Sequence, residues 1–470
     1  MQLTVKEVAE VLGARLDEDA ANKRVLTGIT WDSRKVKQND IFLAMPGERV
    51  DGNDFIIQAI GMGAGLIICT KQPSANTMAI AGEFVCPVIV VESGITAITK
   101  LATHWRSCLR CVVVGVTGST GKTSTKDLLY SVLSTRYNTV ATQGNNNNEL
   151  GIPYTVLRAN PDTEILIVEM GMRALGQIEH GCSIASPSIG VVTNVGVCHM
   201  ELLGSREAIA SAKGEMLAAL PATGLAVVNG DDDMTEYMLE QAQVAEHGVH
   251  VTRFGRGDNC KTQVHNLTIN AEGCASFDMA FSAGVPFHVD LNVPGEHNVM
   301  NALAAAVVGS YMGLTYEQIA KGLAAAGASG MRMEVDKLPS GLTVINDAYN
   351  ANPDSMRAAL ATLGSMECEG KRIAVLGDMG ELGDDEASLH EEVGRDAASG
   401  KLDYLLCVGP LSEHIAKGAQ ETGITCPVEH VPDVSCAAAR LKELSEPGDL
   451  ILLKASRFMG LEKIIKEISD

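Results

Sequence analysis

Short apolar runs recur through the middle of this chain, and each run ends in a polar or glycine-containing turn. The runs predict strands at 112–117, Ile165–Glu169, 189–193 and Leu225–Asn229. Segments with helical spacing separate them. Apolar strands that alternate with helices indicate a largely parallel sheet covered on both faces, with ligands at the carboxyl ends of its strands.

The pattern differs before and after this segment. Residues 1–105 carry a predicted helix at 5–12, helical spacing at 54–60, and strands at 40–45, 66–69 and 87–91. They predict a small α/β recognition domain. Strict alternation predicts antiparallel hairpins at 264–269, 275–281 and 287–293, followed by a helix at 298–309.

A third segment begins near residue 327 and again alternates strands with helices. Its predicted strands lie at 343–346, 372–376, 404–408 and 450–454. It lacks the G-x-G-x-x-G fingerprint, so nothing in this layout suggests NAD. The predicted fold is α/β with three domains, at 1–105, 106–326 and 327–470.

The composition excludes some of the functions that a protein with this predicted fold could have. The chain has 470 residues, 46% of them hydrophobic and 20% charged, so it can bury cores and is not disordered. Lys and Arg number 37 against 58 Asp and Glu, which gives a net charge of −21. This charge argues against a nucleic-acid or anionic-membrane surface, whereas a local positive site could still bind an anionic substrate.

The N-terminus and the cysteines predict a cytosolic protein. Residues 1–10 form an acid-containing amphipathic start, unlike a signal or transit peptide, and no apolar run approaches the ~18 residues that span a membrane. Twelve cysteines do not make a disulfide scaffold in a chain of this length. Cys108 and Cys111 form one C-x-x-C pair, and we favour Cys111 as the start of a buried strand over a redox or zinc role.

The chain is organised around a glycine-rich stretch between the first central strand and a helix. The stretch consists of Thr117, Gly118, Ser119, Thr120, Gly121, Lys122, Thr123 and Ser124. In such a loop the backbone amides and the helix dipole favour an anion, Lys122 can reach the outer phosphates of a nucleotide, and the Thr123 hydroxyl suits Mg²⁺. The pattern G-x-x-x-x-G-K-[ST] requires glycine at 116 and finds Val116. The flanking strand and helix still indicate a phosphate-binding loop.

Three other side chains near the predicted sheet edge could carry chemistry. Glu169 closes an apolar strand, where a carboxylate could hold Mg²⁺ or, alternatively, cap a loop. His199 follows another strand, although a lone histidine is more often structural than a ligand. Lys213 lies on a predicted helix, and its local context is typical of a solvated lysine.

Asparagines gather in three further segments. Residues 144–153 include Asn147 and Asn148 within a run of four asparagines, which is either a plain polar loop or a site for sugar and peptide groups, because amides both donate and accept. Residues 294–301 begin a helix with polar side chains. Residues 347–353 follow a strand of the third domain with an acid and two asparagines.

Together these motifs resemble those of the Mur ligases of peptidoglycan synthesis, over nearly the whole chain. Residues 115–124 look like the family's phosphate loop, in which a glycine also stands one position early. The other matching motifs lie at 144–153, 347–355 and 377–383, with 32–34 and 47–52 similar to the family's uridine-nucleotide domain. The resemblance implies a cytoplasmic ligase, expected as a monomer, that uses ATP and Mg²⁺. It would add D-alanyl-D-alanine to UDP-MurNAc-tripeptide through an acyl phosphate.

The resemblance also implies roles for single residues. Lys122 and Thr123 would hold the ATP phosphates and one Mg²⁺ with Glu169, while His199 would help to bind a second Mg²⁺. Lys213 would be carbamylated, so that a carboxylate replaces an ammonium that repels the metal. The nucleotide would also be bound by Asn298, Asn301, Arg332 and Asp347. The other substrates would be bound by Ser33, Arg34, Asn147, Asn148, Asn350 and Asn352.

Two positions depart from the family pattern, and three alternatives remain. Asn53 stands where many relatives have histidine, and Ala455 replaces a common glycine. The nearest alternatives are the ligase that adds the third peptide residue and folylpolyglutamate synthase; the motif at 350–353 and the uridine-type first domain argue against both. A phosphate-loop GTPase would need an Asn-Lys-x-Asp base reader, which the sequence lacks. Closure of the third domain would exclude water from the acyl phosphate, and we expect a hinge near 327–331.

Overall fold

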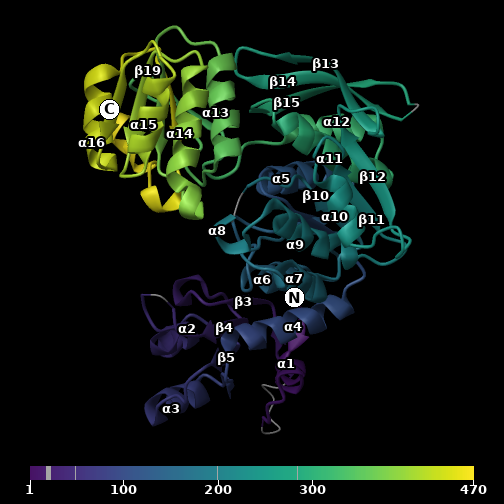
Figure 1. The fold of residues 1–470 in the computed structure, drawn as a ribbon. Helices are drawn as coiled ribbons and strands as arrows, with labels where there is room; N and C mark the ends of the chain where they lie inside the picture. Colours follow the sequence, from purple (N-terminus) through teal and green to yellow (C-terminus); the bar gives the residue numbers. More distant parts are fainter. Residues whose placement is uncertain (17–22, 48, 198–199, 283, 470) are drawn as a thin grey trace. The chain divides into compact units, whose positions relative to one another are not determined.

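The computed structural model describes residues 1–16, 23–47, 49–197, 200–282 and 284–469 (Figure 1). The chain divides into two compact units. The first unit comprises Met1–Gly115, Tyr137–Gly171 and Gln177–Ser188. The second comprises Val116–Arg136, Met172–Gly176 and Ile189–Asp470. No helix among the described residues is both long and apolar enough to cross a membrane.

The largest sheet has nine strands in the order β15-β14-β13-β12-β11-β10-β7-β9-β8. They are β7 (Val112–Thr117), β8 (Thr139–Ala141), β9 (Ile165–Glu169), β10 (Ile189–Val192), β11 (Leu225–Asn229), β12 (His250–Gly255), β13 (Thr262–Ile269), β14 (Cys274–Phe281) and β15 (Phe287–Pro294). The pairs β8–β9, β10–β11 and β11–β12 are parallel, whereas β13–β14 and β14–β15 are antiparallel. The prediction of a parallel sheet with added hairpins is therefore confirmed. Cys111 is buried immediately before β7 rather than within it.

The first unit contains a smaller parallel sheet, β3-β4-β5-β6. Its strands are β3 (Gly28–Thr30), β4 (Asp40–Ala44), β5 (Leu66–Cys69) and β6 (Val88–Val90). A separate antiparallel pair joins β1 (Leu3–Thr4) to β2 (Val25–Leu26). The helices are α1 (Val5–Leu12), α2 (Ile56–Gly61), α3 (Ala75–Glu83), α4 (Gly94–Cys108), α6 (Gly151–Arg158) and α7 (Gln177–Ala185), with short 3₁₀ turns at Ser33–Lys35 and Gly52–Phe55. On α4, Trp105 Nε1 donates to the Ala159 carbonyl at 2.9 Å, which ties α4 to the end of α6.

The second unit begins with the helix that follows the glycine-rich loop, α5 (Lys122–Leu133). It packs against α11 (Asn298–Tyr311) and α12 (Tyr316–Ala325). A Cβ on Gly322 would lie 2.5 Å from the Val132 Cα, so glycine permits this close approach of two helices. The other helices of the segment are α8 (Met200–Leu203), α9 (Arg206–Ala218) and α10 (Thr235–Gln241).

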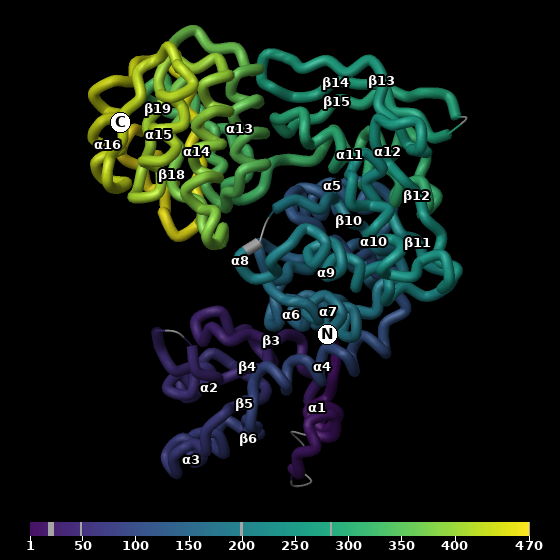
Figure 2. The backbone as a smooth tube through the Cα atoms, in the orientation of Figure 1, coloured from purple at the N-terminus to yellow at the C-terminus, as the bar shows by residue number. Residues whose placement is uncertain are grey.

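The C-terminal part of the second unit, coloured green to yellow in Figure 2, contains a six-stranded sheet. The order of its strands is β16-β17-β21-β18-β19-β20. Its strands are β16 (Glu334–Lys337), β17 (Thr343–Asn346), β18 (Arg372–Gly377), β19 (Tyr404–Val408), β20 (Val428–Val431) and β21 (Leu450–Lys454). Only β16 is antiparallel to its neighbour. The helices are α13 (Pro353–Ser365), α14 (Glu386–Ala398), α15 (Ser412–Glu421), α16 (Val434–Leu444) and α17 (Lys463–Ile468).

Alternating residues of this sheet enter two different apolar clusters. Ala374 and Leu376 belong to one cluster, and Ile373 and Val375 to the other. A strand with apolar residues on both faces must be covered on both faces. This part of the chain is therefore a doubly wound sheet, as its sequence predicts.

Candidate active site

The glycine-rich loop is held by residues that follow β10. Thr193 Oγ1 donates to the Thr120 carbonyl at 2.6 Å. Asn194 accepts from the Thr120 amide at 2.9 Å and donates to the Thr120 hydroxyl at 2.7 Å. The Gly196 amide donates to Ser119 Oγ at 2.9 Å. The protein's own hydrogen bonds thus fix the shape of the loop.

Two glycines of the loop are required by space. Gly118 has φ 150°, and a Cβ there would lie 1.8 Å from Thr193 Oγ1. Gly121 has φ 76° at the start of α5, and a Cβ there would lie 2.5 Å from Asn301 Oδ1. Val116, by contrast, is fully buried within β7, so the position that departs from the general motif lies in the strand and not in the turn.

Lys122 and Thr123 open α5, directly after the loop. Lys122 Nζ donates to the Gly118 carbonyl at 2.6 Å and to the Ser119 carbonyl at 3.1 Å. Thr123 is buried, with 5% of its surface exposed. The lysine therefore lies over the loop whose amides would face a phosphate.

The two asparagines predicted to reach the nucleotide form a buried chain of hydrogen bonds behind the loop. Thr125 Oγ1 donates to Asn301 Oδ1 at 3.1 Å, Asn301 Nδ2 donates to Asn298 Oδ1 at 2.9 Å, and Asn298 Nδ2 donates to the Pro294 carbonyl at 2.8 Å. Asn301 thus supports α5 and the loop from the side of α11. A direct contact of Asn301 with a nucleotide stays a prediction.

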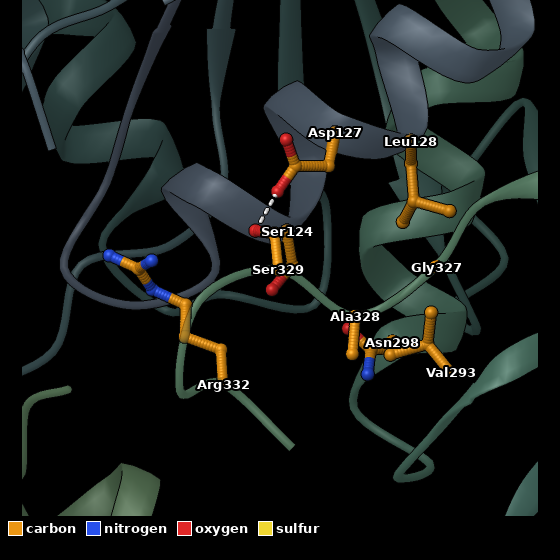
Figure 3. Close-up of a pocket in the computed structure, with 9 residues that line it drawn as sticks. All are labelled: Ser124, Asp127, Leu128, Val293, Asn298, Gly327, Ala328, Ser329 and Arg332. Carbon is orange, nitrogen blue, oxygen red and sulfur yellow. Dashed lines mark hydrogen bonds between the residues drawn. The ribbon is translucent and has the colours of Figure 1, made fainter. Parts of the chain in front are cut away.

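A pocket beside α5 brings together three residues that the sequence predicted to bind a nucleotide: Ser124, Asn298 and Arg332 (Figure 3). It is also lined by Asp127, Leu128, Val293, Gly327, Ala328 and Ser329. The Arg332 guanidinium is stacked 3.7 Å above the Tyr349 ring centroid, which holds the cation in place. The pocket is lined by the first two turns of α5, directly after Lys122 and Thr123.

Asp347 is paired with a lysine that the sequence analysis did not single out. Lys454 Nζ lies 2.5 Å from Asp347 Oδ2 and also donates to the Asn350 carbonyl at 3.2 Å. The Lys454 side chain is 2% exposed. Burial lowers the pKa of the nearby His297, and the Asp347 charge opposes this shift. Lys454 is the last residue of an apolar strand, as Glu169 is. A charged residue at the end of an apolar strand is a sequence pattern from which Lys454 could have been predicted as a site residue.

In the first unit, Glu169 and the asparagine-rich loop are in contact. Glu169 is 1% exposed, and Asn147 Nδ2 donates to its Oε1 at 2.7 Å. Asn148 Oδ1 accepts from the Leu150 and Gly151 amides at 3.3 and 3.0 Å, just before α6. The structure therefore places one asparagine at the carboxylate and gives the other a structural task, while their substrate contacts stay predictions.

The predicted metal ligands fit Mg²⁺ in their chemistry, since Thr123 and Glu169 offer the oxygen atoms that this ion prefers. Lys213 on α9 is 1% exposed, so the reading of a solvated lysine is wrong. His199 lies outside the described residues. Among the residues that are described, no group of three or more His, Cys, Asp or Glu side chains could hold a metal ion.

The predicted uridine-nucleotide residues lie on a short turn of the first unit. Ser33 is buried and donates from Oγ to Gln58 Oε1 at 2.9 Å. Arg34 is exposed, and its guanidinium donates two hydrogen bonds to Asp32, at 2.9 and 3.0 Å. The hydrogen bonds from Arg34 hold the pKa of Asp32 below its usual value.

Two positions near predicted substrate loops have mainly structural partners. Asn53, where many relatives have histidine, donates to Asp51 and Thr70 at 2.6 and 3.0 Å and accepts from the Thr70 amide at 3.2 Å. Asn352 accepts from the Ser355 amide at 2.8 Å and caps α13. Asn350 is exposed. The substrate roles of Asn350 and Asn352 stay predictions.

Three family models match successive parts of the chain. The Mur ligase family catalytic domain matches residues 25–105, the Mur ligase middle domain matches 116–309, and the Mur ligase glutamate ligase domain matches 331–457. The UDP-N-acetylmuramoyl-tripeptide–D-alanyl-D-alanine ligase of Bacillus subtilis (strain 168) is 38% identical, over 99% of this chain and 98% of the relative.

Solved structures agree with these matches. The crystal structure of MurF from Acinetobacter baumannii has a TM-score of 0.85 and 28% identity, and the comparison covers 100% of this chain and 99% of that one. MurF from Thermotoga maritima, solved in complex with ADP, has a TM-score of 0.78 and 28% identity over 96% of this chain and 98% of that one. The fold is thus the three-domain fold of these ligases, and the chain belongs to the Mur ligase family.

Proposed function

We propose that this protein is an ATP-dependent ligase that joins D-alanyl-D-alanine to UDP-MurNAc-tripeptide during synthesis of peptidoglycan precursors. The observation that carries this assignment is the 38% identity, over almost the whole of both chains, to a relative that bears the name of this activity. The loop at Lys122 and the pocket lined by Ser124, Asn298 and Arg332 supply a site for the nucleotide.

The reaction couples phosphoryl transfer to amide formation. The terminal carboxylate of the tripeptide attacks the γ-phosphorus of ATP, the bond to the β–γ bridging oxygen breaks, and ADP leaves. The amine of D-alanyl-D-alanine then attacks the acyl phosphate, loses a proton, and displaces inorganic phosphate as the amide bond forms.

Lys122 is the residue of this chain that would act at the γ-phosphate. Its ammonium now donates to two loop carbonyls and would turn to the phosphate oxygens, where a fixed positive charge stabilises the charge that is transferred. The loop amides would bind the remaining phosphate oxygens. Thr193 and Asn194 would keep those amides aimed, because they hold Thr120 from both sides.

We further propose that Mg²⁺ takes part and that Thr123, Glu169, His199 and a carbamylated Lys213 bind it. Mg²⁺ would neutralise phosphate charge when bound. Lys213 is buried, with 1% of its surface exposed, and a carboxylate formed there by carbamylation would offer the oxygen atoms that Mg²⁺ prefers. We also propose that the enzyme works in the cytoplasm. We propose that it is a monomer, because a single chain carries all the predicted site residues.

One assay tests the assignment. The protein is incubated with ATP, Mg²⁺ and UDP-MurNAc-tripeptide, and phosphate release is measured after addition of D-alanyl-D-alanine or of a single amino acid. We expect release with the dipeptide and none with the amino acid. Phosphate release with the amino acid, and none with the dipeptide, would overturn the assignment.

A further inference from the structure

Asp127 on α5 shares its carboxylate between two partners. Oδ1 lies 2.8 Å from Lys126 Nζ, and Oδ2 accepts a hydrogen bond from Ser329 Oγ (Figure 3). The Lys126 side chain is 5% exposed and that of Asp127 is 25% exposed. The carboxylate thus bridges a nearly buried ammonium and the serine hydroxyl, and hydrogen bonds to a carboxylate are among the stronger ones in proteins.

Ser329 belongs to the segment that joins α12 to β16, and the far side of this segment is bound elsewhere. The Met331 carbonyl accepts from the Tyr349 amide at 3.2 Å, and the Met333 amide donates to Asp347 Oδ1 at 3.2 Å. Ser329 is therefore tied to α5, whereas Met331 and Met333 are tied to the loop after β17.

Gly330 stands between these two sets of contacts. Its φ is 49°, and a Cβ there would have no heavy atom within 4 Å. Glycine adopts this left-handed conformation without strain and changes conformation easily. Within the predicted hinge at 327–331, Gly330 is therefore the residue that lies between the two sets of contacts.

The anchor at Ser329 also shapes the pocket. Gly327, Ala328 and Ser329 line it together with Ser124 and Asn298. Asp127 lies five residues beyond Lys122, about 7.5 Å along the helix axis, so its negative charge stands apart from the phosphate loop. The hydrogen bond from Ser329 to Asp127 joins this side of the pocket to α5.

We propose that Asp127 is a positioning residue for nucleotide binding: it holds residues 327–329 against α5 as one wall of the nucleoside pocket and leaves Gly330 as the pivot. This inference rests on the proposed function. Asp127 would act through Ser329 and would not contact the reacting atoms.

Direct binding of ADP to the full-length chain tests it, measured by isothermal titration calorimetry. We expect Ser329→Ala to weaken ADP binding about fivefold to tenfold, and Ser329→Thr, which keeps the hydroxyl, to stay within twofold of wild type. The matched control is Ser340→Ala, which also removes one hydroxyl hydrogen bond, from Ser340 Oγ to the Ile468 carbonyl. This control should bind ADP as wild type does.

A double-mutant cycle separates positioning from direct contact. We expect Asp127→Asn to weaken ADP binding, and Ser329→Ala to add less than a twofold loss in the Asp127→Asn background. In turnover, Ser329→Ala should raise the KM for ATP and leave kcat and the KM for D-alanyl-D-alanine within twofold.

Three results would overturn the inference. Unchanged ADP affinity in Ser329→Ala, or losses that multiply in the double variant, would show that Asp127 does not act through Ser329. If these results accompany dipeptide-dependent phosphate release by the wild type, the proposed function stands and this inference alone falls. Wild-type protein that neither binds ADP nor releases phosphate would overturn both.

Discussion

Single residues of the phosphate loop are fixed by the space around them. We predict that Gly118→Ala weakens ADP binding at least tenfold and costs about 1–3 kcal/mol of stability, the usual range for overpacking. The new methyl group would stand 1.8 Å from Thr193 Oγ1, which holds the Thr120 carbonyl. Calorimetry with ADP and thermal melting measure the two effects.

The matched control is Gly82→Ala on α3. A Cβ at Gly82 would meet no heavy atom within 4 Å, and alanine is favoured over glycine within a helix by roughly 0.5–1 kcal/mol. This variant should be as stable as wild type or slightly more so. Wild-type ADP affinity in Gly118→Ala would contradict the claim that the Thr193 contact shapes the loop.

Asn352 allows a structural and a substrate-binding role to be separated at one residue. Its side chain caps α13, so we predict that Asn352→Ala costs about 1 kcal/mol, whereas Asn352→Asp, which also caps, costs much less. Urea unfolding measures stability, and the dipeptide-dependent assay measures activity. If Asn352→Asp has wild-type stability but at least a tenfold higher KM for D-alanyl-D-alanine, Asn352 binds the substrate in addition to capping α13.

Local motifs revealed some site residues, while others depend on partners far away in the sequence. Lys122 and Thr123 could be predicted because loop, strand and helix are contiguous. Asp127 could not, since its partner Ser329 is 202 residues away. Lys454 likewise contacts Asp347, which is 107 residues away in the sequence. From the sequence, Asp347 was predicted as a site residue, whereas Lys454 was predicted only as the end of a buried strand.

At the scale of elements, strands were predictable where burial stabilises them. The buried strands β9, β11 and β21 lie at the predicted bounds. The edge strands β16 and β20 were not predicted. Their sequences, Glu-Val-Asp-Lys and Val-Glu-His-Val, are partly exposed, and such strands are stabilised by pairing with a neighbour more than by an apolar pattern.

The loop after β18, one of the matching motifs, depends on a buried histidine of α14. His390 Nε2 accepts from the Met379 amide at 2.9 Å, and Nδ1 donates to the Glu386 carbonyl at 2.6 Å, so the ring is neutral. Burial lowers the pKa of His390 from its ordinary value of 6.5. The loop is therefore positioned by a group that cannot take up a proton without losing a hydrogen bond.

This arrangement predicts that the protein is destabilised by mild acid. Below pH 6.5 the unfolded chain binds a proton at His390 that the folded chain does not bind, so stability falls by up to about 1.4 kcal/mol per pH unit until the lowered pKa is reached. Urea unfolding at pH 7.5, 6.5 and 5.5 measures the slope. His390→Gln should reduce it, while His250→Gln, at an exposed site, should not. Equal slopes in all three proteins would contradict this assignment.

At the scale of the whole molecule, the predicted ligand sites divide between the two compact units. Ser33 and Arg34 belong to the first unit, and the phosphate loop with the pocket belongs to the second. A ligand stabilises the segments that bind it, by about 2.7 kcal/mol when it is present at 100 times its Kd. Each ligand should therefore protect a different part of the backbone.

We predict that ADP slows hydrogen exchange in peptides that cover 118–133 and 327–332, while UDP-MurNAc-tripeptide alone slows it at 32–35. Exchange under conditions where opening is fast reports the population of open states, so saturation should slow it at least tenfold in the bound segments. A peptide from α16, which carries none of the predicted ligand residues, is the internal control and should keep its rate. Protection of 32–35 by ADP, with none at 118–133, would reverse the assignment of the two sites and leave the phosphate loop without its nucleotide.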